Sequence, residues 1–331
     1  MNLPYKLSIV IPLHNEAAAF PLLLQALRRA LADWTEAWQI VAIDDGSRDA
    51  TWQAILTASR EFTDGVADFK GVRFSRNFGK EAAMLAGLEA AQGEWVVVMD
   101  GDGQHPPALL PEMLRRAAEE GVDLVAAQKR ERATDGLSAR WLARLFNRFM
   151  HLATGLDLSN ACDYRLMKRH VVDALLAMPE RTRFFRAMTA WTGFRQADVP
   201  FDVPPRLAGA TAWTTGGLIR LAVTAITGFS AKPLTLIFRI GLLGLVVSIV
   251  LALQALWSWL SGVAVSGWTS LTLVIVFFGS ANLLGIGVMG AYLAQLFDEI
   301  KARPVYLVSA RVETQAHDRR RATRGEQEIA E

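Results

Sequence analysis

The feature that most limits how this chain folds is an uncharged apolar stretch near its C-terminus. Residues 240–297 contain no Asp, Glu, Lys, Arg or His. A helix needs about 20 apolar residues to cross the hydrocarbon core of a membrane, so the stretch is long enough for two crossings. Residues 261–267 contain Gly and Ser and separate two segments, 238–260 and 268–295. The pattern predicts a two-helix transmembrane hairpin. A buried hairpin of a soluble protein is disfavoured because soluble helices of this length carry a charged face.

Basic residues on both sides of the stretch predict its orientation in a membrane. Lys232 and Arg239 precede the hairpin, Lys301 and Arg303 follow it, and the turn between the two segments carries no charge. Basic residues are enriched on the cytoplasmic side, so both termini are expected there. Residues 7–12 are too few for the apolar core of a signal peptide. We therefore expect a multi-pass protein of the cell (inner) membrane whose residues 1 to about 210 and both termini are cytoplasmic.

Charge and residue counts exclude several classes of protein. A net charge of +2 gives no indication of nucleic-acid binding. The single cysteine, Cys162, cannot form an internal disulfide, and the five histidines lack the spacing of a zinc site. Small residues recur four apart in the hairpin, as at Gly244 and Ser248, and such ridges let helices approach closely in lipid. The sequence leaves open whether they pack within one chain or between protomers of a homo-oligomer.

Short apolar runs alternate with helical patterns through the first part of the chain. Strands alternating with helices of about 10–15 residues predict βαβ units and a mostly parallel α/β sheet. Ligands of such sheets bind beyond the carboxyl ends of the strands, so polar residues there are the candidates for a site. The expected strands are 7–11, 39–43, 71–74, 94–99 and 123–126, and the expected helices are 20–32, 51–60, 80–91 and 108–120.

Four polar clusters follow the first four expected strands. Each one has an ordinary structural explanation as a turn or a helix cap. Four such clusters at consecutive strand ends are better explained by a ligand site. They are Pro12-Leu-His-Asn-Glu16, Asp44-Asp-Gly-Ser-Arg-Asp49, Arg76-Asn-Phe-Gly-Lys-Glu81 and Asp100-Gly-Asp-Gly-Gln-His-Pro-Pro107.

The fourth cluster carries the clearest chemical signal. Asp100 and Asp102 follow an apolar strand, and Gly101 between them allows close approach of a ligand. Mg²⁺ or Mn²⁺ takes one or two protein carboxylates and completes its shell with phosphate oxygens and water. Gln104 adds a neutral oxygen. We therefore expect a Mg²⁺ or Mn²⁺ ion held by Asp100, Asp102 and Gln104.

These clusters, in this order, resemble the family-2 glycosyltransferases with the GT-A fold. The motifs Cys162-Asp-Tyr-Arg-Leu-Met167 and Ala190-Trp-Thr-Gly-Phe194 extend the resemblance, which covers nearly the whole chain with the terminal hairpin. Within the family, the chain is similar to the membrane-bound polyprenyl-phosphate glycosyltransferases, including dolichol-phosphate-mannose synthases and bacterial undecaprenyl-phosphate sugar transferases. The resemblance implies a Rossmann-like GT-A domain with a mostly parallel sheet, followed by a two-helix transmembrane hairpin.

The resemblance also implies roles for individual residues. Asp102 and Asp163 would be the catalytic residues, with Asp163 near the acceptor. Asp100, Asp102 and Gln104 would hold the metal ion and the donor diphosphate. The donor-binding residues would be Pro12, Asn15, Glu16, Asp44, Asp45, Lys80, Asp100 and Gly101.

The acceptor region is where the chain departs from the family. The resemblance implies that Lys129, Arg132 and Arg206 bind the phosphate of a polyprenyl acceptor. Ala212 stands where the family often has lysine. Lys129 stands where arginine is expected, and it lacks the two-pronged guanidinium that binds phosphate. These departures affect the acceptor pocket and leave the metal site intact.

We expect four parts along the chain. Residues 1–212 form the glycosyltransferase domain, 213–234 an amphipathic juxtamembrane segment, 235–297 the two transmembrane helices and 298–331 a polar cytoplasmic tail. The juxtamembrane prediction rests on apolar residues at helical spacing, and an ordinary core helix remains its alternative.

The predicted function is transfer of a monosaccharide, with inversion, from a nucleotide-diphosphate sugar to a polyprenyl phosphate of the membrane. The acceptor phosphate is mostly ionised at neutral pH, so no strong general base is required. A processive polysaccharide synthase is disfavoured because Leu137 breaks the Gln-x-x-Arg-Trp signature. A nicotinamide-dependent oxidoreductase is disfavoured because the first strand lacks a Gly-x-Gly-x-x-Gly turn. A catalytically silent membrane scaffold of the same fold is the remaining alternative.

Overall fold

The computed structural model describes residues 3–62, 67–130, 161–204, 232–261 and 267–314. Within these ranges the chain forms two compact units. One unit is built around a single mixed sheet, and residues 303–314 belong to it although they follow the long helices in sequence. The other unit consists of the two long helices.

The sheet has eight strands in the order β7-β5-β6-β4-β1-β2-β3-β8. The four adjacent strands β4, β1, β2 and β3 are parallel to one another, and β5 is parallel to β7. Strands β6 and β8 run antiparallel to their neighbours. This confirms the mostly parallel sheet that the sequence predicts. The strands are β1 (Tyr5–Leu13), β2 (Trp38–Asp44), β3 (Ala67–Phe74), β4 (Gly93–Val98), β5 (Leu124–Lys129), β6 (Ala161–Lys168), β7 (Gln196–Phe201) and β8 (Val308–Glu313).

Helices cover both faces of the sheet. Alternate residues of β1 show the two layers: Ile9 and Ile11 belong to the core cluster that includes α1, α2 and α4, whereas Val10 contacts Gly87 of α3. A strand covered on both faces has no solvated side, which explains why every residue of β2 is buried. The helices of this unit are α1 (Ala19–Ala30), α2 (Thr51–Glu61), α3 (Lys80–Ala90), α4 (Leu110–Glu120), α6 (Arg169–Ala177) and α7 (Phe185–Trp191), with a 3-10 turn, η1, at Pro107–Leu109.

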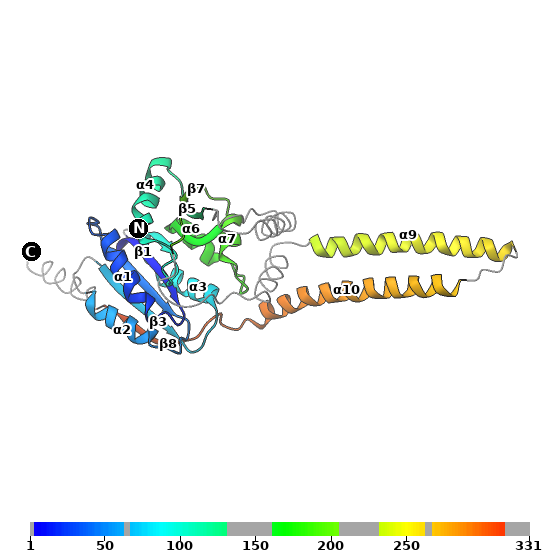
Figure 1. Ribbon diagram of the computed structural model, residues 1–331, viewed down its shortest axis with the longest axis horizontal. Helices are drawn as coiled ribbons and strands as arrows, with labels where there is room; N and C mark the ends of the chain where they lie inside the picture. The colour runs from blue at the N-terminus through cyan, green and yellow to red at the C-terminus, as the bar shows by residue number, and fades with distance from the viewer. Residues whose placement is uncertain (1–2, 63–66, 131–160, 205–231, 262–266, 315–331) are drawn as a thin grey trace, which may run out of the picture. The chain divides into compact units, whose positions relative to one another are not determined.

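The two long helices are α9 (Lys232–Leu260) and α10 (Trp268–Lys301), which extend beyond the predicted segments 238–260 and 268–295. They pack side by side and antiparallel (Figure 1). A Cβ added at Gly244 would lie 2.7 Å from the ring of Phe278, so the predicted small residue does bring the helices close. Both helices are long and apolar enough to cross a membrane, and their apolar side chains are exposed, as Leu283 shows at 72%. A lipid environment accounts for apolar faces that no described part of the chain covers.

β8 corrects the expectation that residues 298–331 form only a polar tail. After α10 the chain returns to the sheet, and β8 pairs antiparallel with β3 from Lys70–Glu313 to Phe74–Val308. Ala310 and Val312 pack against the core. Residues up to 231 of the predicted juxtamembrane segment, and residues beyond 314, lie outside the described residues.

Candidate functional site

A cavity of about 300 Å³ lies at the carboxyl ends of β1, β2 and β4, beside the first turn of α3. This is the edge of a parallel sheet where ligands bind in α/β proteins. Each of the four predicted polar clusters contributes at least one predicted site residue to its wall. The predicted residues that line it are Pro12, Glu16, Asp45, Lys80, Asp100, Gly101 and Asp102.

Asp45 organises one wall of the cavity through the backbone of the loop before α3. Its Oδ1 accepts a hydrogen bond of 2.6 Å from the Phe78 amide, and its Oδ2 accepts one of 3.0 Å from the Gly79 amide. Burial raises the pKa of Asp45, and these two amide donors act in the opposite direction. Asp45 therefore fixes the loop that carries Asn77 and Gly79 into the cavity wall.

Asp44 and Asn15, also predicted to bind the donor, support the cavity from behind. Asp44 is fully buried, accepts a hydrogen bond from the Ser47 amide at 2.8 Å and lies 3.3 Å from Arg73 Nε. Asn15 has a φ of 58° and accepts a hydrogen bond from the Arg48 amide at 2.9 Å. Neither side chain lines the cavity. Their contacts hold the turn after β2 in place.

His14 lines the cavity and was not among the predicted site residues. Its Nδ1 lies 2.9 Å from the carbonyl oxygen of Asp45, and a carbonyl can only accept, so Nδ1 carries the proton. The other ring nitrogen, Nε2, then accepts a hydrogen bond, and the side-chain amide of Asn77 lies 3.2 Å away. His14 thus joins the ends of β1 and β2 to the loop before α3.

The Asp100-Gly101-Asp102 turn forms the acidic side of the cavity. A Cβ added at Gly101 would lie 2.3 Å from Leu13 Cδ2, so a larger residue between the two aspartates would have to displace the Leu13 side chain. Asp102 Oδ1 accepts a hydrogen bond from the Gln104 amide at 3.0 Å, which orients that carboxylate. The Gln104 side chain does not line the cavity.

The donor set at this turn suits a divalent ion that keeps part of its shell for other ligands. Among the described residues there is no group of three or more His, Cys, Asp or Glu side chains arranged around a metal position. Two neighbouring carboxylates are the usual protein contribution to a Mg²⁺ or Mn²⁺ ion that also binds phosphate oxygens. Asp100 and Asp102 fit such an ion.

His105 supports Asp100 from the core. Its ring stacks on Tyr164, with centroids 5.1 Å apart, and its Nδ1 accepts a hydrogen bond of 2.9 Å from the Asp100 amide. Burial lowers the pKa of His105, which favours the neutral ring. A neutral ring with Nδ1 as acceptor carries its proton on Nε2, which faces Asp100 Oδ2 at 3.7 Å.

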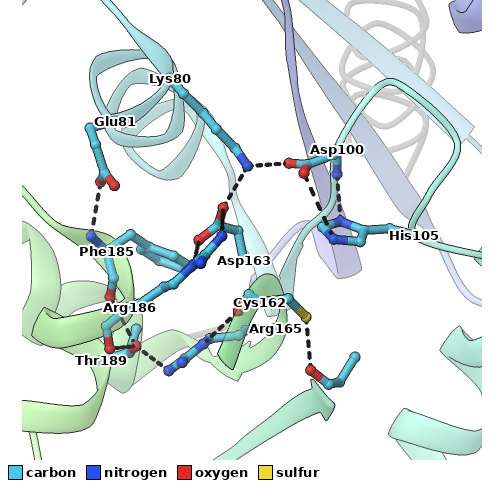
Figure 2. A network of polar contacts seen from close by, with 11 residues as sticks. Lys80, Glu81, Asp100, His105, Cys162, Asp163, Arg165, Phe185, Arg186 and Thr189 are labelled. Carbon is cyan, nitrogen blue, oxygen red and sulfur yellow. Dashed lines mark hydrogen bonds and ion pairs between the residues drawn. The ribbon is translucent and has the colours of Figure 1, made fainter. Parts of the chain in front are cut away.

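Lys80 connects the acidic turn to Asp163 of β6 (Figure 2). Its Nζ lies 2.7 Å from Asp100 Oδ1 and 2.5 Å from Asp163 Oδ2. Arg186 of α7 binds the same Asp163 carboxylate with two nitrogens, Nε at 2.7 Å from Oδ1 and NH2 at 3.0 Å from Oδ2. Burial alone would raise the pKa of Asp163, but Lys80 and Arg186 outweigh it and hold the pKa well below the usual range.

Glu81 lies behind this network and ties α3 to α7. One of its carboxylate oxygens accepts a hydrogen bond of 2.9 Å from the Phe185 amide, at the start of α7 (Figure 2). Burial, and then the negative charge of Asp163, raise the pKa of Glu81 to about 7. Consecutive residues of α3 thus fix both the Asp163 carboxylate and the helix that carries Arg186.

Of the three residues predicted to bind the acceptor phosphate, the described part of the chain includes Lys129. Lys129 is the last residue of β5 and does not line the cavity. Arg132 and Arg206 lie outside the described residues. Among the described residues, the cavity therefore brings together most of the predicted donor and metal residues, and Lys129 lies outside it.

Arg186 is the main functional candidate that the sequence analysis missed. It is separated from Asp163 by more than two turns of helix and a loop, and no spacing rule joins the two residues. Its position just before the Ala190-Trp-Thr-Gly-Phe194 motif was the available signal. Asn77 and Gly79, in contrast, belong to a cluster that the sequence analysis had already singled out.

Comparison with known proteins identifies the family. The family model described as glycosyl transferase family 2 matches residues 8–176. Among solved structures, this chain is similar to glucosyl-3-phosphoglycerate synthase from Mycobacterium tuberculosis. The match covers 68% of this chain and 78% of that protein, with a TM-score of 0.45 and 20% sequence identity.

Relatives of similar length match nearly the whole chain. An uncharacterized glycosyltransferase of Synechocystis sp. is 37% identical, over 92% of this chain and 95% of its own length. The prophage bactoprenol glucosyl transferase homolog of Escherichia coli K12 is 35% identical over 92% of this chain and 98% of its own length. The bactoprenol glucosyl transferase of Shigella phage SfII is 34% identical over 92% of this chain and 97% of its own length. The resemblance drawn from the sequence motifs is thus confirmed, and the chain belongs to glycosyl transferase family 2.

Proposed function

We propose that this glycosyltransferase moves a monosaccharide from a nucleotide-diphosphate sugar to a polyprenyl phosphate at the cytoplasmic face of a membrane, with inversion at the anomeric carbon. The observation that carries the proposal is the cavity in which Asp45, Asp100 and Asp102 face Lys80 at the carboxyl edge of the sheet. The relatives named bactoprenol glucosyl transferases support a polyprenyl acceptor, and they make glucose the first sugar to test.

The residues of the cavity divide the work of donor binding. Pro12, Glu16 and Asp45 lie on the side formed by β1 and β2, where we place the nucleoside. Asp100 and Asp102 lie on the β4 side, where we place the diphosphate. Lys80 also lines the cavity, and its ammonium, which contacts Asp100 and Asp163, is our candidate to contact the donor phosphates.

Asp100 and Asp102, with Gln104 as a third candidate ligand, would hold a Mg²⁺ or Mn²⁺ ion. When bound, such an ion neutralises the donor diphosphate and stabilises the charge that develops on the departing nucleotide. The chain itself orients these ligands, because the Gln104 amide fixes Asp102 and the His105 ring fixes the backbone of Asp100.

Asp163 acts in this proposal by holding Lys80 in place. Both of its oxygens are engaged by Lys80 and Arg186, and its side chain is 5% exposed. A carboxylate bound on both oxygens is a poor proton acceptor. The reaction does not need a strong base, because a phosphate monoester with a second pKa near 6 is mostly ionised at neutral pH. Direct attack by the acceptor phosphate accounts for single displacement with inversion.

Strand pairing supports a topology with two crossings. β3 precedes the long helices and β8 follows them, yet the two strands pair in one sheet. Because one folded sheet lies on one side of a membrane, both flanks of the helix pair belong on the same side. The excess of basic residues at those flanks favours the cytoplasmic side. Lys129, Arg132 and Arg206 remain our candidates for binding the acceptor phosphate.

The test is transfer of labelled sugar to a lipid by the purified full-length protein in detergent. A panel of radiolabelled nucleotide sugars, with UDP-glucose first, is mixed with undecaprenyl phosphate and MgCl₂ or MnCl₂, with and without EDTA. We expect label in an organic-extractable lipid, loss of the label with EDTA, and an inverted anomeric configuration in the product.

Three results would contradict the proposal in different ways. Label in a long water-soluble polymer would favour a processive synthase. A product of retained configuration, or a trapped sugar–enzyme adduct, would exclude single displacement. No transfer from any donor would favour a catalytically silent scaffold.

A further inference from the structure

The segment that follows α10 contacts the loop that shapes the donor cavity. We call residues 303–313 the C-terminal strap and residues 75–79 the donor loop. The Ser75 amide donates a hydrogen bond of 2.9 Å to the Leu307 carbonyl, and Ser309 Oγ donates one of 3.1 Å to the Phe74 carbonyl. The strap is therefore bonded to the donor loop at the point where β3 ends.

Tyr306 is the side chain of the strap that contacts both elements flanking the donor loop. Its ring stacks on Phe74, the last residue of β3, with centroids 4.7 Å apart and an interplanar angle of 17°. Its hydroxyl donates a hydrogen bond to Glu89 of α3. Because the donor loop runs from β3 to α3, Tyr306 bridges the two elements that anchor it.

A chain of contacts leads from Tyr306 to the cavity. Phe74 packs edge-on against Phe78 of the donor loop, with centroids 5.8 Å apart. The Phe78 amide then donates the 2.6 Å hydrogen bond to Asp45 that shapes the cavity wall. On the other side, a Cβ added at Gly46 would lie 2.3 Å from the Arg76 carbonyl carbon, so the loop packs directly against the turn after β2.

The donor loop depends on these outside contacts for its conformation. Ser75, Arg76 and Asn77 are exposed, and Gly79 has a φ of 99° that L side chains rarely adopt. A loop without buried side chains at its centre has little packing of its own to order it. Phe78 is the residue whose ring reaches the core through Phe74 and whose amide reaches Asp45.

We propose that Tyr306 is a positioning residue for donor binding: its stacking on Phe74 holds Phe78 where the Phe78 and Gly79 amides bind Asp45. This inference rests on the proposed function in so far as the cavity is taken to bind the donor.

The experiment compares Tyr306→Ala with Tyr306→Phe, which keeps the ring and loses the hydroxyl. Glu313→Gln is the matched control, since it removes a strap contact at the far end of β8, where Glu313 Oε1 lies 2.6 Å from Lys70 Nζ. Two readouts are taken on the full-length protein: hydrogen–deuterium exchange of the amides in peptides covering residues 75–79, and the KM and kcat for UDP-glucose with undecaprenyl phosphate.

Faster exchange at the donor loop and a higher donor KM are expected for Tyr306→Ala, each by about two- to tenfold, which is the range for loss of one aromatic pair. We expect kcat and the acceptor KM to stay within about twofold, and Tyr306→Phe and Glu313→Gln to match the parent protein. Unchanged exchange in Tyr306→Ala, or an equal change in Glu313→Gln, would overturn the inference.

The two readouts separate this inference from the proposed function. If no nucleotide sugar is turned over by the parent protein, the proposed function fails, and the exchange data alone decide whether Tyr306 orders the donor loop. If transfer occurs but the donor KM is unchanged in Tyr306→Ala, the inference fails and the proposed function stands.

Discussion

The ammonium of Lys80 lies 2.7 Å from the carboxylate of Asp100, so a residue expected to bind a metal ion already faces a cation from its own chain. The same ammonium lies 2.5 Å from Asp163, which Arg186 holds from the opposite side. Positive and negative groups therefore alternate across the site. Under the proposed function, an anionic donor that enters the cavity would meet Lys80 between Asp100 and Asp163.

Replacement of Lys80 by methionine, which keeps the length of the side chain and removes its charge, is expected to lower kcat by about 100-fold. The reason is loss of the one described cation that contacts both Asp100 and Asp163. The kcat of each variant is measured in steady-state assays of sugar transfer to undecaprenyl phosphate. Lys6→Met removes an ion pair of 2.9 Å with Glu94 and serves as the control. Equal activity in the two variants would contradict the role given to Lys80.

Removal of Arg186 tests whether Asp163 needs its second partner. Arg186→Ala leaves a buried carboxylate bound only by Lys80, and we expect the free energy of unfolding to fall by about 3 kcal/mol. Arg186→Lys keeps the charge but loses the two-pronged contact, so a smaller loss is expected. Urea denaturation of both variants measures the difference. Arg195→Ala, at an exposed ion pair 3.4 Å from Asp123, is the control. An unfolding free energy of Arg186→Ala equal to that of the parent protein would show that the Arg186–Asp163 ion pair does not stabilise the fold.

The parallel core of the fold and most of the residues that line the cavity could be predicted from the sequence. Short apolar runs alternate with helices because the central strands are buried on both faces, and this leaves a strong local pattern. Since parallel strands end at one edge, the clusters at Pro12, Asp45 and Asp100 had to meet there. They line one cavity in the structure.

Contacts between distant segments could not be predicted in the same way. Arg186 reaches Asp163 through the packing of α7 against β6, and neither residue carries a local signal for the other. β8 did leave a signal, because Val308, Ala310 and Val312 alternate with Ser309 and Arg311. That alternation is short, and the long helices separate it from the rest of the sheet in sequence, so the sequence pattern alone predicts a polar tail there.

Glu81 predicts a pH dependence of stability. Its pKa rises from an ordinary value of 4.5 to about 7 in the folded protein. Between these values the folded state holds more protons than the unfolded state, so stability decreases as pH rises from about 4.5 to about 7 and levels off above that. The total loss from this group is about 3 kcal/mol.

Glu81→Gln removes this titration and keeps an oxygen that accepts from the Phe185 amide. The difference in unfolding free energy between variant and parent, measured from pH 5 to pH 8, is expected to grow in favour of the variant. If the difference in unfolding free energy between the two proteins stays constant from pH 5 to pH 8, the pKa of Glu81 is not raised in the folded protein.

The most direct test of the whole account is the Asp102→Asn variant. Asparagine keeps an oxygen for the hydrogen bond from the Gln104 amide, so the turn is preserved while the charge is lost. The measurement is the rate of lipid-linked product formation with Mg²⁺ or Mn²⁺, beside Asp173→Asn as a control at an exposed aspartate on α6. We predict that Asp102→Asn loses at least about 100-fold in rate with an unchanged melting temperature. Transfer at the parent rate by Asp102→Asn would contradict the assignment of this acidic turn as the centre of the reaction.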